Sequence, residues 1–409
     1  MEPLVSKNST CKCVGILTSG GDCPGLNAAI RAVARSAAQQ GMTVIGIRDG
    51  FRGLVERRAA ILHPADVSGI LTLGGTVLGT SRDKPNKMPM GQAGKLDMTA
   101  AALANYDALH LDCLVCLGGG GTQKNALHLA REGGINVVTL PKTIDNDVAG
   151  TDITFGFYTA LLTATEAIDR LHSTAESHHR VMVVEIMGHR AGWLTLAAGV
   201  SGGADVILIP EIPYDAEAVA ASLKGRVRSG KLFSIVAVAE GAVSREDDQR
   251  RRADDEQKAA GKKGKHKDKG KAKEGREHKD KDKRKHEDRE DPALAVGKRF
   301  SDHDFVPATA GQRVARQIEA LTGLETRVTV LSHLQRGGTP SPADRMLASQ
   351  LGNRAVELIV KGESGFMVGV RGDEYVPVPL EEVAGKLKLV PLNHSLVRTA
   401  RNVGTFLGQ

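Results

Sequence analysis

Short apolar runs that end in glycine-rich or charged loops recur along the first half of the chain. Residues 13–18 and 43–47 are such runs, and residues 28–39 between them have the apolar spacing of a helix. The same order of strand, loop and helix repeats over residues 114–130, 137–147 and 181–198. Strands that alternate with helices predict parallel sheets, in which ligands bind at the carboxyl ends of the strands.

A second group of apolar runs predicts a second α/β layered unit. Its expected strands are residues 180–186, 206–209, 233–239 and 326–331, and a helix is expected at residues 309–322. The chain has 409 residues, which is enough for two or three domains with sizeable cores.

The alternating pattern stops between residues 244 and 291, where Lys, Asp, Glu, His and Gly dominate. This segment is too polar to bury a core, so it is interpreted as a disordered or loosely helical insertion within one domain. Residues 258–285 hold 14 Lys and Arg against 5 Asp and Glu, and subtracting this local +9 from the net +7 leaves −2 for the rest. The insertion is therefore either a solvated segment or a contact arm for anionic partners.

Composition limits the kinds of partner expected for this protein and the cellular compartment in which it is expected. Aromatic residues make up 3% of the chain, which leaves few stacking platforms and argues against nucleic-acid binding. No apolar stretch approaches the ~20 residues that span a membrane, and no signal-peptide core is present, so we expect a cytoplasmic protein without a membrane partner. The odd number of cysteines fits a reducing compartment, and the pair Cys113 and Cys116 lies in an apolar run where buried thiols are expected.

Two segments at the ends of predicted strands carry the clearest chemistry. Residues 117–122 read Leu-Gly-Gly-Gly-Gly-Thr, and such a loop at the start of a helix offers backbone N–H groups to an anion. Residues 141–147 read Pro-Lys-Thr-Ile-Asp-Asn-Asp, which places two carboxylates and an ammonium close together. A phosphate cradle beside a carboxylate and a positive charge is what phosphoryl transfer requires.

Five motifs in order resemble the 6-phosphofructokinase family over about residues 13–390. They are residues 18–27 (Thr-Ser-Gly-Gly-Asp-Cys-Pro-Gly-Leu-Asn), the loop 117–122, residues 141–147, residues 185–188 (Glu-Ile-Met-Gly) and residues 333–338 (His-Leu-Gln-Arg-Gly-Gly). Five independent motifs in one order are far more specific than a lone glycine-rich loop.

The resemblance implies an α/β fold of two doubly wound (Rossmann-like) parallel-sheet domains with the active site in the cleft between them. Residues 13–156 with 335–385 would bind the donor nucleotide, and residues 157–334 with 386–409 would bind the sugar phosphate. It also implies a glycolytic, Mg²⁺-dependent enzyme that phosphorylates fructose 6-phosphate to fructose 1,6-bisphosphate. The family forms homo-oligomers, so a homodimer or homotetramer with shared active sites is expected.

The resemblance also assigns the catalytic centre. Asp145 matches the base that takes a proton from the sugar hydroxyl, since an alcohol needs a positioned carboxylate to become a nucleophile. Asp147 matches a carboxylate that serves the metal, and Thr143 matches a residue that hydrogen-bonds the substrate or the transferred phosphoryl group. Lys142 belongs to the same catalytic segment.

The substrate and donor sites follow from the remaining motifs. The residues that match the family's fructose 6-phosphate ligands are Arg180, Met187, Gly188, Glu240, Arg327, His333 and Arg336. Of these, Arg180 and Arg327 reach in from an adjacent subunit in the family. The residues expected to bind the donor phosphates are Gly20, Arg82, Gly118, Gly119, Gly120, Gly121 and Thr122.

Two positions of the glycine loop bear on the donor and on the metal. In the family, glycine at position 121 leaves room for the α-phosphate of a nucleotide, while Asp there accompanies pyrophosphate. Lys142 is common in pyrophosphate-dependent members and also occurs in some ATP-dependent ones, so ATP is favoured and pyrophosphate is the alternative. Where the family usually has a metal-binding Asp this chain has Gly120, which raises a third hypothesis of a weakly active or regulatory paralogue.

Overall fold

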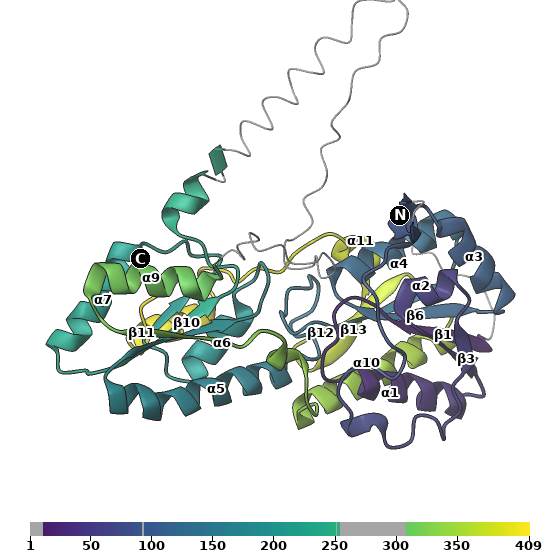
Figure 1. Cartoon of the computed structure of the whole chain (residues 1–409). Coiled ribbons are helices and arrows are strands. Elements are labelled where there is room, and N and C mark those ends of the chain that lie inside the picture. The colour runs from purple at the N-terminus through teal and green to yellow at the C-terminus, as the bar shows by residue number, and fades with distance from the viewer. Residues whose placement is uncertain (1–10, 92–93, 251, 254–307) are drawn as a thin grey trace, which may run out of the picture. The chain divides into compact units, whose positions relative to one another are not determined.

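The computed structural model describes residues 11–91, 94–250, 252–253 and 308–409 (Figure 1). The chain divides into two compact units, Met1–Val243 with Ala310–Gln409, and Ser244–Thr309. Both large sheets belong to the first unit. Most of the charged segment 244–291 falls outside the described residues, so its interpretation stays a prediction.

The larger sheet has, within the described residues, seven strands in the order β13-β12-β7-β6-β1-β2-β3. Its strands are β1 (Cys13–Thr18), β2 (Thr43–Ile47), β3 (Ala59–Ile61), β6 (Cys113–Gly118), β7 (Val137–Pro141), β12 (Phe366–Arg371) and β13 (Glu374–Pro379). The five strands from β12 to β2 pair in parallel, which confirms the predicted parallel sheet, although β12 itself was not predicted. The edge strands β3 and β13 pair antiparallel, which differs from the expected all-parallel sheet.

The antiparallel edge formed by β12 and β13 has a local cause. Arg371 of β12 pairs with Glu374 of β13, so only two residues form the turn. Gly372, the first of them, has a φ of 59°, which glycine adopts without strain. A two-residue hairpin can join only antiparallel strands, so this strand reverses direction at the edge of the sheet.

The smaller sheet has four described strands, all parallel, in the order β11-β8-β10-β9. They are β8 (Val181–Ile186), β9 (Val206–Leu208), β10 (Ser234–Ala239) and β11 (Thr326–Val330). Each predicted strand of this group is confirmed to within one residue at either end. A two-stranded hairpin completes the described strands, formed by β4 (Met88–Pro89) and β5 (Lys95–Leu96).

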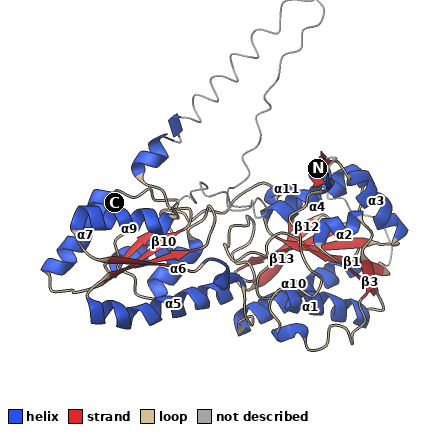
Figure 2. Ribbon diagram, viewed as in Figure 1, coloured by secondary structure: helices blue, strands red, loops and turns tan. Residues whose placement is uncertain are grey.

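Helices cover both faces of both sheets (Figure 2). They are α1 (Leu26–Gln39), α2 (Gly50–Val55), α3 (Thr99–Ala108), α4 (Gly120–Gly133), α5 (Phe157–His178), α6 (Trp193–Ser201), α7 (Ala216–Arg228), α9 (Ala310–Thr322), α10 (Pro342–Val360), α11 (Leu380–Val383) and α12 (Ser395–Asn402). Residues of α1, α10, α5 and α6 share one apolar cluster, and residues of α2, α3 and α4 form another on the opposite face of the larger sheet. Helices α7 and α9 cover the other face of the smaller sheet.

The strand sequences explain why both faces are covered. In β6, Val115 and Leu117 lie in one apolar cluster, and Leu114 and Cys116 lie in the cluster on the other face. Successive strand residues point to opposite faces, so a strand that is apolar throughout is stable only between two layers of helices. The doubly wound α/β fold is confirmed for both sheets.

Two further expectations concern the cysteines and the membrane. Cys113 and Cys116 are buried free thiols, and burial raises the pKa of both, so neither is a thiolate at neutral pH. Among the described residues, no helix combines the length and the apolar character that a membrane crossing requires.

Candidate functional site

The predicted phosphate loops meet at the switch point of the larger sheet. Strands β1 and β6 are neighbours, but the chain continues from β1 toward β2 on one side and from β6 toward β7 on the other. The loops after two such strands diverge and leave a crevice at the carboxyl edge, where α/β proteins bind ligands. The loop after β1 contains Gly20, Gly118 to Gly121 span the end of β6 and the start of α4, and Lys142 follows β7.

Backbone hydrogen bonds hold the first loop in place. The Ser19 N–H donates to the Leu117 carbonyl at 3.0 Å, which joins the ends of β1 and β6. Gly20, with a φ of 89°, donates its N–H to the Ser81 carbonyl at 2.9 Å, and its own carbonyl accepts from the Thr80 hydroxyl at 2.8 Å. The structure therefore places the segment that carries Arg82 directly beside Gly20.

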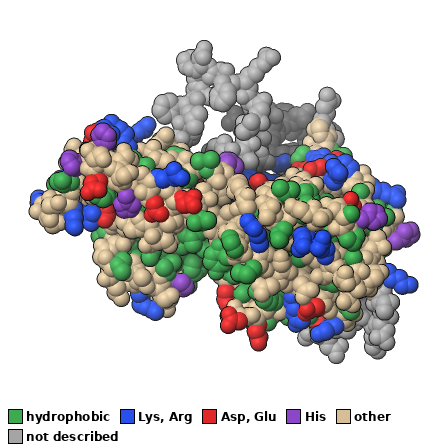
Figure 3. Space-filling view, turned by 90° about the horizontal axis from the view of Figure 1, so that it is seen from below, with side chains coloured by type: hydrophobic (Ala, Val, Ile, Leu, Met, Phe, Trp, Pro, Cys, Tyr) green, Lys and Arg blue, Asp and Glu red, His purple; other side chains and the backbone are tan. Residues whose placement is uncertain are grey.

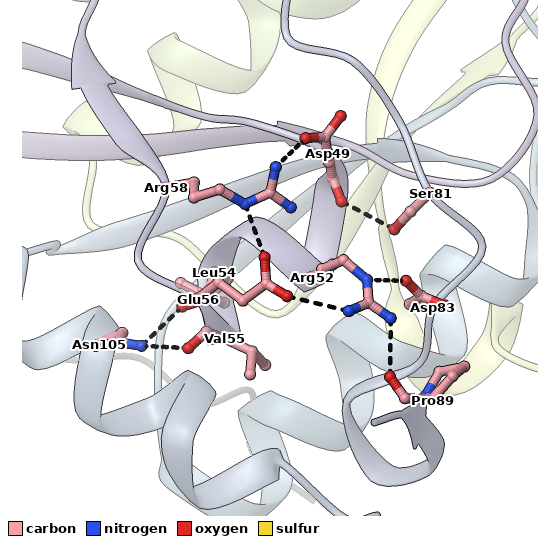
Figure 4. A network of polar contacts seen from close by, with 10 residues as sticks. All are labelled: Asp49, Arg52, Leu54, Val55, Glu56, Arg58, Ser81, Asp83, Pro89 and Asn105. Carbon is pink, nitrogen blue, oxygen red and sulfur yellow. Dashed lines mark hydrogen bonds and ion pairs between the residues drawn. The ribbon is translucent and has the colours of Figure 1, made fainter. Parts of the chain in front are cut away.

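A charged network fixes the segment around Arg82 (Figure 4). The Ser81 hydroxyl donates to the Asp49 carbonyl at 2.8 Å, and Asp83 accepts from Arg52 Nε at 2.5 Å. Asp49 in turn pairs with Arg58. Both neighbours of Arg82 are thus anchored, while the Arg82 side chain itself is exposed and positioned to meet an anion in solvent.

The second loop leads into the N-terminus of α4, which begins at Gly120. No side chain of the described residues caps this end, and the Gly119 carbonyl accepts the Thr122 and Gln123 N–H groups, at 2.9 and 3.1 Å. The N–H groups of the first helical turn have no intrahelical acceptor and carry the positive end of the helix dipole. This end of α4 is therefore a suitable anion cradle.

Packing requires glycine at one position of this loop but not at two others. A Cβ at Gly118 would overlap the Thr122 side chain, so this glycine is needed for packing. At Gly120 and Gly121 a Cβ would meet no described atom within 4 Å, and neither has a positive φ. Neither backbone strain nor packing requires glycine at these two positions, which fits close approach of a ligand. The Thr122 hydroxyl is already engaged, since it donates to the Ser19 carbonyl at 3.3 Å.

The catalytic segment follows β7 and is largely buried. The side chain of Lys142 is buried and donates to the Gly21 carbonyl, while its own N–H bonds the Gly118 carbonyl at 3.2 Å. Lys142 therefore lies between the two phosphate loops. Burial lowers the pKa of its ammonium. The Thr143 hydroxyl accepts the Asp145 N–H at 3.1 Å, which fixes the turn into the acidic pair.

Asp145 has the environment of a general base. Its side chain is 8% exposed, and Oδ1 has no hydrogen-bond partner among the described residues. Burial raises its pKa to about 6, with a further increase from the neighbouring charge of Asp147. An unpartnered buried carboxylate is costly, so a functional reason is expected for it.

Two of the residues expected to bind the sugar phosphate, Glu240 and Arg336, interact electrostatically with Asp145. The charge of Glu240, which follows β10, also raises the pKa of Asp145, and the charge of Arg336 opposes this increase. Glu240 Oε1 accepts the N–H groups of Gly188 at 3.1 Å and His189 at 2.7 Å, so it holds the loop after β8. Gly188 has a φ of 155°, and a Cβ there would lie 2.5 Å from the Ala191 carbonyl, so only glycine fits.

The motif at residues 333–338 bridges the two sets of loops. Arg336 Nη1 donates to the Asp22 carbonyl at 3.1 Å, and its Nε is buried without a described partner. Its neighbour Gln335, which the sequence did not single out, is fully buried and accepts the Met187 N–H at 2.9 Å. His333 is exposed and contacts the Ser332 hydroxyl at 3.1 Å.

Arg180 and Arg327 lie elsewhere. Both sit at the amino ends of their strands in the smaller sheet, where Glu325 binds both guanidinium groups. Glu240 lies at the opposite end, and six strand residues span about 20 Å. The chain's own fold therefore does not bring Arg180 and Arg327 to Asp145.

The residues present fit a Mg²⁺ ion only if substrate supplies most of its ligands. Among the described residues, no three His, Cys, Asp or Glu side chains are grouped so that they could hold a metal. Asp147 is half-buried, and burial raises the pKa of its carboxyl. Mg²⁺ commonly takes one or two carboxylates, with waters and substrate phosphates as the other ligands, so a single carboxylate such as Asp147 is compatible with a Mg²⁺ site of this kind.

The fold and site thus define a doubly wound α/β protein whose switch-point loops form a phosphate cradle next to a buried carboxylate. A family model described as "Phosphofructokinase" matches residues 13–359. The chain belongs to the phosphofructokinase family.

Relatives of nearly the same length are available for comparison. The chain is 51% identical to an "ATP-dependent 6-phosphofructokinase" of Spirochaeta thermophila over 98% of this chain and 99% of the relative. It is also 51% identical to a protein of the same name from Propionibacterium freudenreichii subsp. shermanii, over 97% and 99%. Among solved structures it resembles phosphofructokinase from Saccharomyces cerevisiae, with a TM-score of 0.70 and 29% identity over 91% of this chain, which spans 45% of the yeast chain.

Proposed function

We propose that this chain is an ATP-dependent 6-phosphofructokinase of glycolysis, acting in the cytoplasm. It transfers the γ-phosphoryl group of ATP to the 1-hydroxyl of fructose 6-phosphate. The observation that carries the proposal is Asp145 Oδ1, a buried carboxylate oxygen without a hydrogen-bond partner in the described part of the chain, on a side chain that interacts with the charges of Arg336 and Glu240. The names of the relatives favour ATP over pyrophosphate, and the open space at Gly121 supports the same choice.

The chemistry follows from the positions of these groups. Asp145 takes the proton of the 1-hydroxyl as the oxygen attacks the γ-phosphorus, and the bond to the β-phosphate oxygen breaks to release ADP. The donor phosphates lie against the N-terminus of α4, Gly20 and Arg82, while Lys142 holds the two loops together and Thr143 orients the segment. Mg²⁺, when bound, offsets the charge of the donor phosphates, and Asp147 would hold it. The sugar phosphate is bound by Met187, Gly188, Glu240, His333 and Arg336.

The purified protein tests the proposal directly. Fructose 1,6-bisphosphate should form with ATP and Mg²⁺, and much more slowly with pyrophosphate. Turnover with pyrophosphate alone would assign the alternative donor. A protein that binds fructose 6-phosphate but turns over with neither donor would be a regulatory paralogue.

Gly120→Asp should improve metal binding. An Asp side chain fits at this position, since no described atom lies within 4 Å of its Cβ, and a carboxylate is favourable at a helix N-terminus. We expect the Mg²⁺ concentration for half-maximal rate to fall about tenfold, because a second carboxylate joins Asp147. Gly120→Asn is the control of equal size without the charge. Identical Mg²⁺ dependence in the wild type and both variants would show that the metal site already has its full set of ligands.

We also propose a homodimer or homotetramer in which Arg180 and Arg327 complete the site of a neighbouring subunit. Their position at the amino edge of the smaller sheet, away from Asp145, supports this assignment. Exposed apolar side chains offer contact surface on α5 (Tyr158, Leu162) and α10 (Met346, 62% exposed). Figure 3 shows hydrophobic side chains gathered on the face seen from below, the side on which α5 lies.

Complementation tests shared sites. Asp145→Asn and Arg180→Ala should each be inactive as homo-oligomers. Coexpressed, they form hybrids in which one of two sites carries neither change, so about a quarter of wild-type activity should return for random dimers. Tagged hybrids that stay inactive would place Arg180 in the site of its own subunit.

A further inference from the structure

A short C-terminal segment runs along the catalytic loop. Leu387 forms an antiparallel bridge with Val148, and the Lys388 N–H donates to the Asp147 carbonyl at 2.9 Å. We name residues 387–390 the strap. The strap therefore contacts the backbone of the residue that we assign to the metal.

The Lys388 side chain binds the turn between the two catalytic carboxylates. Its Nζ donates to Asn146 Oδ1, to the Thr151 carbonyl and to the Asp152 carbonyl, each at 2.9 Å. An ammonium has three N–H donors, so all are used and none remains for a substrate. Asn146 Nδ2 donates to the Asp152 carbonyl at 3.3 Å, which closes the cluster.

Asn146 is the residue whose conformation sets the directions of its neighbours. It has a φ of 52°, in the left-handed region that side-chain-bearing residues seldom adopt. Because Asp145 and Asp147 flank this residue, a change in its φ would turn the two carboxylates relative to each other. The bond from Lys388 acts on the one residue of the acidic segment that is held in this unusual conformation.

The strap is fixed at its other side by the sugar-binding half of the site. Trp193 Nε1 donates to the Lys388 carbonyl at 2.9 Å, and the Trp193 ring lies 5.3 Å from Lys388 Nζ. Glu211 Oε1 accepts the N–H groups of Val390 and Gly192, both at 2.9 Å. Residues 192 and 193 follow the loop that contains Met187 and Gly188. One segment thus ties the catalytic turn to the loop expected to bind the sugar.

We propose that Lys388 is a positioning residue for phosphoryl transfer, which fixes the left-handed turn at Asn146 and so aims Asp145 at the bound sugar. This rests on the proposed function. A displacement of about 1 Å at a reacting group can lower a rate by about 10²-fold, even when substrate binding is unchanged. Lys388 therefore acts on kcat through Asp145 rather than on affinity.

Lys388→Met removes the three donors and keeps the length of the side chain. We expect kcat to fall about 100-fold while the Kd for fructose 6-phosphate, measured by calorimetry, stays within about threefold of wild type. Lys386→Met is the matched control, because Lys386 is an exposed lysine two residues away whose loss changes the net charge equally. Lys388→Arg restores charge and donors and should recover at least tenfold of the lost kcat.

The outcomes separate the hypotheses. The positioning role would be overturned if the kcat of Lys388→Met lay within threefold of the Lys386→Met value. It would also be overturned if Lys388→Met lost kcat and sugar affinity equally and Lys388→Arg recovered neither. If Lys388→Met does not fold, Trp193→Phe decides, since it keeps an aromatic ring and removes one hydrogen bond to the strap. A severalfold lower kcat at unchanged affinity supports the role, and unchanged kcat overturns it. An inactive wild type would instead contradict the proposed function.

Discussion

Replacing Asp145 with asparagine should lower kcat by about 10²- to 10⁴-fold, the range that a general base contributes. The amide keeps the size of the side chain but cannot accept the proton of the sugar hydroxyl. Because the residues expected to grip the sugar phosphate are separate, the Kd for fructose 6-phosphate should change by less than about threefold. Steady-state kinetics with calorimetry measures both.

Asp107→Asn is the matched control for this variant. Asp107 is an exposed carboxylate of α3, and we assign it no role in the site. Its kcat should stay close to that of the wild type. An Asp145→Asn protein that retains more than a tenth of wild-type kcat would exclude Asp145 as the base.

The same carboxylate predicts the pH dependence of the wild type. With a pKa of about 6, Asp145 is ionised and competent above pH 6 and protonated below it. We therefore expect kcat/KM to fall as the pH drops through about 6. The residual activity of Asp145→Asn should lack this acidic limb.

Stability should change in the opposite direction from activity. The pKa of Asp145 is raised from 3.8 to about 6, so folding favours the protonated form, and the stabilising contribution present below pH 3.8 is lost as the pH rises through 6. Above that pH the buried ionised group costs on the order of 3 kcal/mol. Asp145→Asn should therefore raise the free energy of unfolding at pH 8, and this gain in stability should shrink as the pH falls through 6. Urea titrations without Mg²⁺ measure both effects. A loss of stability at pH 8 would show that the carboxylate makes a favourable contact in the free protein.

How far the sequence predicted the fold depended on how apolar each strand is. Residues 13–18 and 43–47 were predicted to the residue, because these strands are mostly apolar and buried and are bounded by polar or glycine-rich segments. The strands β12 and β13 were not predicted. The apolar pattern of these strands is interrupted by prolines at positions 377 and 379 and by the charged hairpin between Arg371 and Glu374. They form the edge of the sheet because β12 pairs with β7 and β13 pairs with β12.

The residues of the site also fall into two groups, those that a contiguous sequence motif indicates and those that only contacts between distant segments bring into the site. Asp145, Lys142 and the loop Gly118 to Gly121 stand in contiguous motifs, so the sequence alone could assign them. Lys388 stands in no motif, and it reaches Asn146 across 242 residues of sequence. Two of its three acceptors are backbone carbonyls, which any residue supplies, so no pairing of residue types in the sequence could have indicated it.

The choice of donor should depend on a single position at the start of α4. Gly121→Asp should lower kcat/KM for ATP by about 10²- to 10³-fold, because a like charge forced against a phosphate costs several kcal/mol. The protein itself should tolerate the change, since no described atom lies within 4 Å of a Cβ at this position. The affinity for fructose 6-phosphate and the Tm should therefore stay close to wild type.

Gly121→Asn separates size from charge in this prediction, because it has the same shape and no charge. If crowding of the α-phosphate is the main effect, the asparagine variant should lose nearly as much ATP activity as the aspartate variant. If repulsion dominates, it should lose much less. Neither variant should lose activity with pyrophosphate, because pyrophosphate has no nucleotide α-phosphate to accommodate and Lys142 already lies between the two loops. The ratio of pyrophosphate turnover to ATP turnover should therefore rise. Unchanged kinetics with ATP in both variants would show that the nucleotide does not pass close to α4, and the donor site would then have to be sought away from the glycine loop.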